Sequence, residues 1–167
     1  MVWRNLEQIG LTPKELGHMA FSLVKISCCL HVTATYLIDP AIVGGPSMLP
    51  TMGPMATFLL TERNSLRFGK VERGDIVLVR SPVNPRNLLT KRLLGLEGDS
   101  VTFLVDPRNS DKCETIVVPK GHVWVQGDNI YNSRDSRQFG PVPYGLLYAK
   151  VFWRLWPLGG FGPLGKN

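Results

Sequence analysis

One serine of this chain stands in a turn bracketed by glycine and proline. Residues 44–51 read GGPSMLPT, and Ser47 follows Pro46 directly. Proline fixes its own backbone φ, whereas Gly44 and Gly45 permit conformations and close backbone approach that a side chain would block. Such a turn would hold the hydroxyl at a fixed angle to a substrate, as a nucleophile requires. Taken alone, the same pattern is more economically interpreted as a plain turn that follows an apolar segment.

A serine hydroxyl is a poor nucleophile at neutral pH and needs a base that takes its proton. Histidine is the usual base, and the chain has three. His18 and His31 lie before or within an apolar segment, and His122 begins a predicted strand. None of them has an acidic partner at a persuasive spacing, so a Ser-His-Asp triad is poorly supported.

Lysine can act as the base instead, but only in its neutral form. The ordinary lysine pKa of about 10.4 leaves the amine charged at pH 7, and burial lowers that pKa. In a strand, Lys91 shares one face with Leu89 and Leu93, while Arg92 points the other way. The side chain of Lys91 could therefore be buried in an apolar layer, where its pKa would be lowered. The competing interpretation is a surface lysine whose methylene stem covers apolar side chains.

Four blocks of the sequence resemble the type I signal peptidase family and occur in that family's order. They are the turn at 44–51, RGDIVLV at 73–79, TKRLLGLEGD at 90–99 and QGDNIYNSRDSRQFGPV at 126–142. The resemblance extends from about residue 44 to about residue 151, and its DSRQFGPV run is most similar to the mitochondrial inner membrane protease, subunit 1 type. It implies a serine endopeptidase with a Ser-Lys dyad on a fold of antiparallel sheets.

The resemblance assigns roles to individual residues. Ser47 would be the nucleophile, and Lys91 would take its proton, return it to the leaving amine and later activate water against the acyl-enzyme. Ser133 matches the serine that hydrogen-bonds the catalytic lysine, and Asp135 and Arg137 match a pair that braces the same region. Because they are spaced two residues apart, these three side chains share a face if the segment is extended.

Two departures from the family pattern concern the same site. The backbone N–H of Ser47 would supply one donor to the anionic intermediate, but Gly45 stands where many members carry a second donor, a serine hydroxyl. Glycine is common at this point in the mitochondrial branch. Residues 52–57 (MGPMAT) lack the Gly-Asp pair that usually follows Pro-Thr-Leu. Pro46 and Met48, on either side of the serine, are expected to bind substrate.

Residues 19–38 form a moderately apolar segment with the length of one membrane-spanning helix, about 20 residues. Lys25 weakens this interpretation, although its stem can reach the membrane interface. Two rivals stay open, namely an amphipathic surface helix and a cleavable secretory signal that ends near Ala34. The predicted organisation is a polar segment (1–18), this candidate transmembrane anchor (19–38), a catalytic domain (39–156) and an irregular tail (157–167).

The remainder of the chain predicts a mainly β fold. Short runs of β-branched and apolar residues alternate with turns of glycine, proline and asparagine. The predicted strands are 57–61, 75–80, 100–105, 115–118, 122–126 and 144–154. Such spacing, with few helical patterns, indicates an antiparallel β domain, in agreement with the signal-peptidase-like fold that the resemblance implies.

Composition limits the partners that we expect. The net charge is +6 and the pI about 9.5, yet the lysines and arginines are scattered rather than gathered in one stripe. We therefore expect attraction to lipid headgroups and no binding of nucleic acid. The cysteines show no metal-ligand spacing, and neither a metal nor an organic cofactor is expected. The three cysteines are Cys28, Cys29 and Cys113.

The resemblance thus predicts a membrane-anchored protease that removes sorting signals from precursor polypeptides delivered to the mitochondrial intermembrane space. It would lie in the inner membrane with its catalytic domain facing that space, in a hetero-oligomer with a related subunit. An extended peptide would bind along a strand edge, with a shallow pocket for a small residue before the cut. The alternatives are a bacterial-type or thylakoid signal peptidase, and a catalytically silent subunit that binds precursors. A self-cleaving repressor is disfavoured because residues 1–40 hold an apolar segment instead of a DNA-binding helix pair.

Overall fold

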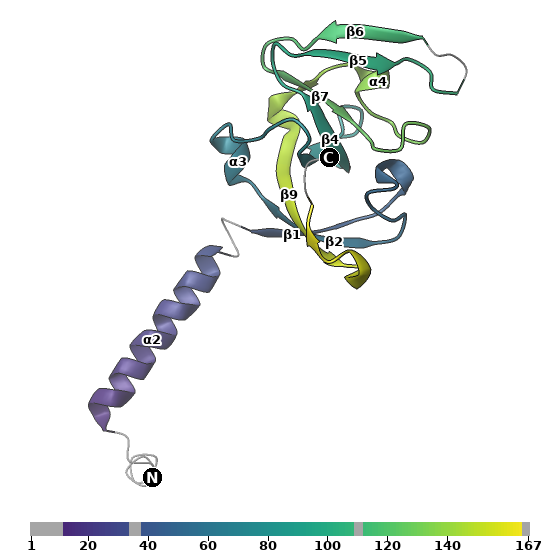
Figure 1. The fold of residues 1–167 in the computed structure, drawn as a ribbon. Coiled ribbons are helices and arrows are strands. Elements are labelled where there is room, and N and C mark those ends of the chain that lie inside the picture. The colour runs from purple at the N-terminus through teal and green to yellow at the C-terminus, as the bar shows by residue number, and fades with distance from the viewer. Residues whose placement is uncertain (1–11, 34–37, 109–111, 165–167) are drawn as a thin grey trace. The chain divides into compact units, whose positions relative to one another are not determined.

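The computed structural model of the chain describes residues 12–33, 38–108 and 112–164. The chain divides into two compact units, Met1–Leu37 and Ile38–Asn167. The first unit contributes one long helix, and the second contributes all the strands that are labelled in Figure 1. The two units are described separately below.

The helix of the first unit, α2, covers Pro13–Val32. It begins in a capping box, in which Glu15 N–H donates to Thr12 Oγ1 (3.3 Å) and Thr12 N–H donates to Glu15 Oε2 (2.8 Å). Pro13 suits the first helical position because the N–H that it lacks has no intrahelical partner there. The helix therefore starts six residues before the predicted apolar segment, and the polar segment 1–18 is helical in its last part.

No residue of α2 is buried within its own unit, and its apolar side chains are exposed. None of the described helices is both long enough and apolar enough to cross a bilayer. The end of the predicted anchor, residues 34–37, lies outside the described residues.

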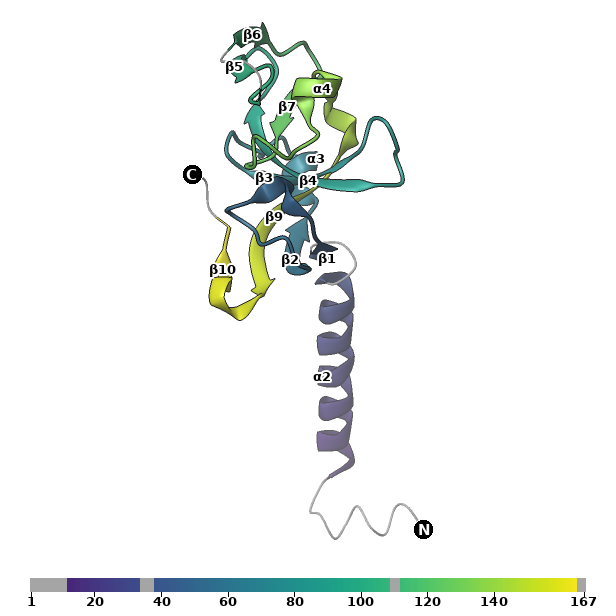
Figure 2. The ribbon, with the colours of Figure 1, turned by 90° about the vertical axis from the view of Figure 1, so that its right-hand side faces the viewer.

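The second unit is built on an antiparallel sheet with the strand order β1-β2-β9-β3-β4-β7-β8, and β10 pairs with β9. Its strands are β1 (Asp39–Val43), β2 (Thr57–Glu62), β3 (Ile76–Arg80), β4 (Leu88–Gly95), β7 (His122–Gln126), β8 (Val142–Pro143), β9 (Leu147–Trp156) and β10 (Gly162–Pro163). A separate hairpin pairs β5 (Ser100–Leu104) with β6 (Cys113–Val117). Figures 1 and 2 show this hairpin at the opposite end of the unit from β1 and β2.

Short helical turns connect the strands. They are η2 (Pro46–Met48), α3 (Asn64–Arg67), α4 (Ser136–Phe139), η3 (Tyr144–Leu146) and η4 (Leu158–Gly160). Two of them, η2 and α4, lie in the blocks that carry the family resemblance.

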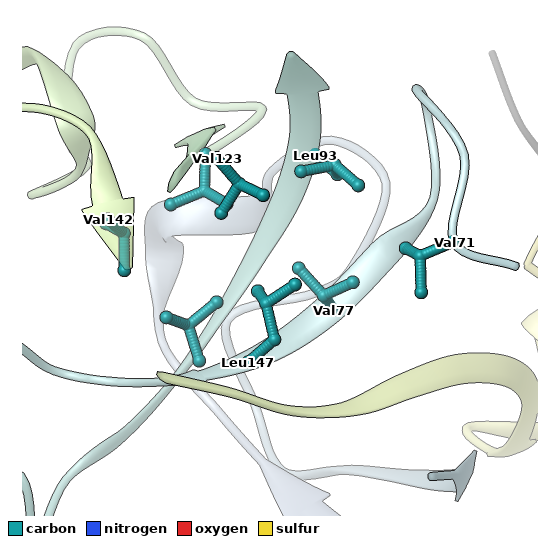
Figure 3. Packing of buried hydrophobic residues seen from close by; sticks show 8 residues of the cluster. Val71, Val77, Leu93, Val123, Val142 and Leu147 are labelled. Carbon is teal, nitrogen blue, oxygen red and sulfur yellow. The ribbon is translucent and has the colours of Figure 1, made fainter. Parts of the chain in front are cut away.

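The sheet is buried on both faces. Along β3, Val77 and Val79 belong to one cluster, whereas Ile76 and Leu78 belong to another, as the alternation of a strand requires. Figure 3 shows the first cluster, in which Val77 packs near Leu93, Val123, Val142 and Leu147. The second cluster contains Met48, Met52, Leu59, Ala149 and Val151 as well. Burying each large apolar side chain contributes about 1.5–3 kcal/mol, so these two layers hold the central strands in place.

The predicted mainly β, antiparallel fold is confirmed. The strands expected at 75–80, 100–105 and 122–126 occur within one residue of their predicted bounds. The strand expected at 144–154 begins only at Leu147, because the residues before it form the turn η3. The tail 157–167 is less irregular than predicted, since it contains η4 and β10, the latter paired to Trp153 and Arg154.

Candidate active site

The turn that presents Ser47 is a short 3-10 helix. Gly45 caps it with φ 122°, a conformation open essentially only to glycine, and Pro46 occupies the first helical position. Met48 is 2% exposed and fixes the turn in the second apolar cluster, while Ser47 itself is half-buried. Gly45 N–H donates to Pro54 O (3.1 Å), so the loop after Thr51 holds the turn from the other side.

A second segment, residues 127–129, donates hydrogen bonds to two backbone carbonyl oxygens of the serine turn. Asn129 N–H donates to Ser47 O (3.0 Å), and Asn129 Nδ2 donates to Pro46 O (3.1 Å). Gly127 lies between the two serines: a Cβ added to it would stand 2.4 Å from Ser47 O and 2.2 Å from Ser133 Oγ. Only glycine fits this position without displacing backbone, and Ser47 and Ser133 therefore lie against the same residue.

Lys91 comes from β4 and is 2% exposed. Its Nζ donates to Ser133 Oγ (3.1 Å). Burial is the largest influence on the amine and lowers the pKa of Lys91, because the charged form loses its water. The nearby Asp135 carboxylate opposes this lowering and the Arg137 guanidinium adds to it, and the net result is a pKa below the ordinary lysine value.

Asp135 and Arg137 form a buried ion pair beside the lysine. Asp135 Oδ1 accepts from Arg137 Nε (2.9 Å), and Asp135 Oδ2 accepts from Arg137 Nη2 and Gly127 N–H, both at 2.9 Å. Burial raises the pKa of the Asp135 carboxyl, but these bonds, together with one from Ser133, outweigh it and hold the pKa below the ordinary value.

The segment 133–137 is not extended, so the condition under which its three side chains would share a strand face is not met. Asp135 is the N-cap of α4, and its carboxylate accepts from Arg137 N–H (3.2 Å) in a capping box with Gln138. The segment therefore turns into a helix at this point. The side chains of Ser133, Asp135 and Arg137 meet because the turn folds them together, and not because they alternate along a strand.

A cavity of about 200 Å³ connects the two central residues. Both Ser47 and Lys91 line it, together with residues of β1, of η2 and its flanking loops, of β3 and of the first half of β4. Met48 and Gly45 line it as well, whereas Pro46, expected to bind substrate, is not among the described lining residues. In the described structure Lys91 Nζ is hydrogen-bonded to Ser133 and not to Ser47. Catalytic hydrogen bonds are often long before substrate binds and shorten in the complex.

Sequence reasoning missed a second polar group next to the site. Arg92 Nε and Nη2 donate to the two oxygens of Asp128 (2.8 and 2.7 Å), and Thr51 Oγ1 donates to the same carboxylate (2.5 Å). This group holds the end of the serine loop against β4. Arg92 was expected to point away from Lys91, which it does, but its burial was not foreseen. The sequence signal for this pair was weak: Arg92 and Asp128 lie in two of the blocks that carry the resemblance, 36 residues apart.

The described residues contain no group of three or more His, Cys, Asp or Glu side chains placed to hold a metal ion. The site presents a serine hydroxyl, a lysine amine and a carboxylate–guanidinium pair. Their arrangement suits acyl transfer by a hydroxyl with an amine base.

Comparison with known proteins identifies the family of the chain. The family described as signal peptidase, peptidase S26, matches residues 16–107 and 104–156. The mitochondrial ATP-independent inner membrane protease subunit 1b of Arabidopsis thaliana is 57% identical over 92% of this chain and 91% of its own length. The human mitochondrial inner membrane protease subunit 1 is 40% identical over 92% of this chain and 89% of its own length.

Subunit 2 of the same protease is also similar to this chain. The protein from Schizosaccharomyces pombe is 41% identical over 73% of this chain and 67% of its own length. Together these relatives confirm the predicted family and the prediction of a mitochondrial signal peptidase. The chain belongs to the signal peptidase family, peptidase S26, and its relatives there are the mitochondrial inner membrane proteases.

Proposed function

We propose that the chain is a serine endopeptidase in which Ser47 attacks the peptide carbonyl and Lys91 is the general base. Lys91 Nζ takes the hydroxyl proton as the Ser47 Oγ–carbon bond forms, and it passes that proton to the nitrogen of the leaving amine as the C–N bond breaks. A water molecule then gives a proton to Lys91 and attacks the ester, which releases the acid and restores the Ser47 hydroxyl.

The observation that carries this proposal is a buried amine beside a serine, in one cavity, without a carboxylate bonded to it. Lys91 is 2% exposed, and its hydrogen bond goes to the hydroxyl of Ser133. Donation of one N–H to Ser133 leaves the lone pair of the neutral amine free to accept a proton. Asp135 accepts from Arg137 and from Ser133, so the carboxylate orients the serine and does not neutralise the lysine directly.

The intermediate oxyanion needs fixed donors. The backbone N–H of Ser47 is available for this role, because the first N–H groups of a helix have no intrahelical acceptor. Gly45 has no hydroxyl to add, and its φ of 122° explains why a side chain is disfavoured there. The second donor therefore comes from elsewhere, such as a backbone group or water.

Two strand edges are open to a substrate beside the cavity. β1 pairs only with β2, and β7 pairs with Arg92, Leu93 and Gly95 of β4, which leaves the edge of residues 88–91 without a strand partner in the described chain. The cavity lies between these two edges. An extended peptide placed there would hydrogen-bond to both. At about 200 Å³, the cavity suits a small side chain at the residue before the cut.

The names of the relatives also suggest where the chain works and with which partner. We propose that the chain works at the mitochondrial inner membrane in a hetero-oligomer of two related subunits, since subunits 1 and 2 both resemble it. Residues 19–38 would hold it there, with the β domain in the intermembrane space. The exposed apolar side chains of α2, among them Phe21, Leu23 and Ile26, support contact with lipid or with a partner helix. Precursors delivered to that space would be the substrates.

The full-length chain carrying Ser47→Ala or Lys91→Met tests the dyad. Each substitution should lower cleavage of a precursor at least about 10³-fold, because members of such a unit fail together. Ser100→Ala and Lys70→Met, at exposed positions, serve as matched controls and should cleave at the parent rate. Parent-rate cleavage by either dyad variant would remove the proposal.

A further inference from the structure

The β1 wall of the proposed substrate groove continues past the cavity, whose lining on β1 starts at Ala41, whereas the open edge of β4 starts within the cavity lining. β1 begins at Asp39, eight residues before Ser47, and the open part of β4 begins at Leu88, three residues before Lys91. Leu88 lines the cavity, and Arg80 of β3 is its cross-strand partner. The far end of the groove is therefore bounded by Asp39 on one wall and by Arg80 beside the other.

One aromatic ring connects these two sides. Tyr148 of β9 packs on the apolar cluster that contains Met48, and its hydroxyl donates to Asp39 Oδ2 (3.2 Å). The Arg80 guanidinium carbon lies 5.1 Å from the centre of the same ring, and that of Arg63 lies 4.3 Å from it. Arg63 also donates to both Asp39 and the Tyr148 hydroxyl.

The four polar side chains of this group, Asp39, Arg63, Arg80 and Tyr148, carry a net charge of +1. Arg63 is neutralised by Asp39, to which it is bonded. Among the described residues, Arg80 forms no salt bridge, and its contact in this group is with the ring of Tyr148. Arg80 is exposed, so its N–H donors are open to a ligand that extends beyond the cavity.

We infer that Arg80, held against Tyr148, forms a distal subsite that accepts an acidic side chain of the substrate. The inference rests on the proposed function, because it assumes that a peptide occupies the groove. A carboxylate there would meet a fixed cation and a phenol ring at the end of the path set by β1 and β4. Arginine suits this role, since its planar fork can bind both oxygens of a carboxylate.

Strand spacing places the contacting substrate residue. Leu88 lies three residues from Lys91, about 10 Å at the strand rise of about 3.3 Å, and the side chain of Arg80 extends from the next strand, about 4.8 Å away. For a peptide that runs parallel to β4, this distance places the acidic residue about four to six residues before the cut. The subsite would select among precursors by residues far outside the pocket for the small side chain.

Synthetic peptides with one small residue before the cut test this subsite. Glu, Gln or Lys is placed singly at each position from the third to the eighth before the cut, and kcat/KM is measured with the full-length chain in detergent. At low salt the parent should prefer Glu to Gln by about 2–5-fold at the fourth to sixth positions, as an exposed ion pair allows, and the preference should fall in high salt. Arg80→Gln should abolish it, and Arg80→Glu should invert it in favour of Lys.

Controls separate this inference from its alternatives. Arg67→Gln, at another exposed arginine, should keep the parent's Glu preference. An unchanged Glu/Gln ratio in Arg80→Gln would overturn the subsite while leaving Ser47-dependent cleavage, and hence the proposed function, intact. Cleavage that survives Ser47→Ala would instead remove the proposed function. If Arg80→Gln slows all peptides equally, and only with vesicles of anionic lipid, the site binds a lipid headgroup and the inference is wrong.

Discussion

Lys91 and Arg92 are consecutive cations of β4, and both are buried, with 2% and 7% of their surface exposed. Their environments differ in one respect. Arg92 is bonded to both oxygens of the Asp128 carboxylate, whereas Lys91 is bonded to the hydroxyl of Ser133. The hydrogen bonds that Arg92 donates to Asp128 raise the pKa of Arg92, and burial lowers the pKa of Lys91.

The comparison shows that the partner, and not burial alone, decides what a buried cation can do. A cation bonded directly to a carboxylate keeps its charge and serves the structure. A buried lysine whose hydrogen-bond partner is a neutral hydroxyl has a lowered pKa and loses its proton more easily. One strand thus presents a structural arginine on one face and, on the other, the lysine that we propose as the base.

Replacement of each cation by methionine should therefore change stability by very different amounts. Arg92→Met leaves the Asp128 carboxylate, 14% exposed, without its charged partner and should lower the free energy of unfolding by about 3–5 kcal/mol. Lys91→Met puts an apolar side chain of similar length in an apolar site and should change it by less than about 1 kcal/mol. Urea denaturation of the full-length chain in detergent, followed by circular dichroism, measures both.

The exposed Arg86→Met is the control for this pair and should stay within about 0.5 kcal/mol of the parent. The double variant Arg92→Met/Asp128→Leu should recover part of the loss, because no unpaired charge remains. Equal losses in Lys91→Met and Arg92→Met would contradict the distinction between the two cations.

Ser133→Ala sharpens the same distinction through activity. Loss of the hydroxyl removes the hydrogen-bond partner that orients Lys91 and should lower kcat about 10²-fold, while KM stays near the parent value because Ser133 is not among the described cavity-lining residues. Steady-state kinetics with a precursor peptide separates the two constants.

Ser136→Ala is the matched serine control. Its Oγ accepts from Val125 N–H (3.0 Å) in the interior, so its loss should cost about 1–3 kcal/mol of stability and spare kcat at temperatures where the variant is folded. A kcat loss in Ser136→Ala as large as that in Ser133→Ala would show that Ser133 acts only through stability.

The smallest expected effect concerns Gly45. Gly45→Ser would restore the hydroxyl that many family members carry, but at a φ of 122° it should cost about 1–3 kcal/mol of stability. Because a strained turn would move Ser47, kcat should not rise. A higher kcat with unchanged thermal stability would show that the turn accepts a second side-chain donor.

The environment of Lys91 could be predicted from the sequence, but the ion pair of Arg92 could not. The alternation of a strand places Lys91 with Leu89 and Leu93 and sets Arg92 on the other face, and a local pattern is enough for that. The pairing of Arg92 with Asp128 depends on how β4 and β7 align, and the two residues are 36 positions apart. No local pattern contains that information.

The differences between the predicted and observed secondary structure have separate causes. β1 has five residues and a proline, Pro40, so its pattern is too short to predict, although an edge strand tolerates proline. The start of α2 could have been predicted, because Thr12, Pro13 and Glu15 form the sequence signature of a capping box. At 133–137 the spacing of two suggested a strand, but Asp135 followed by Gln138 is a helix-cap signal of the same kind.

The ionisation of Lys91 also enters the stability of the fold. Its pKa is lower in the folded chain than in the unfolded chain, so between these two values the unfolded state binds more protons. The stability of the parent relative to Lys91→Met should therefore rise with pH across this window and level off above about 10.4. Cleavage should increase over the lower part of the same window, as the folded amine loses its proton.

Direct titration of Lys91 tests the central claim. The full-length Ser47→Ala chain, labelled with ¹³C at lysine Cε, is followed by NMR in detergent, and Lys91→Met identifies the resonance. The account predicts a pKa for Lys91 well below the ordinary value of about 10.4, and a still lower pKa when Asp135→Asn removes the carboxylate that raises it. A Lys91 resonance that titrates at or above the ordinary value would contradict the account.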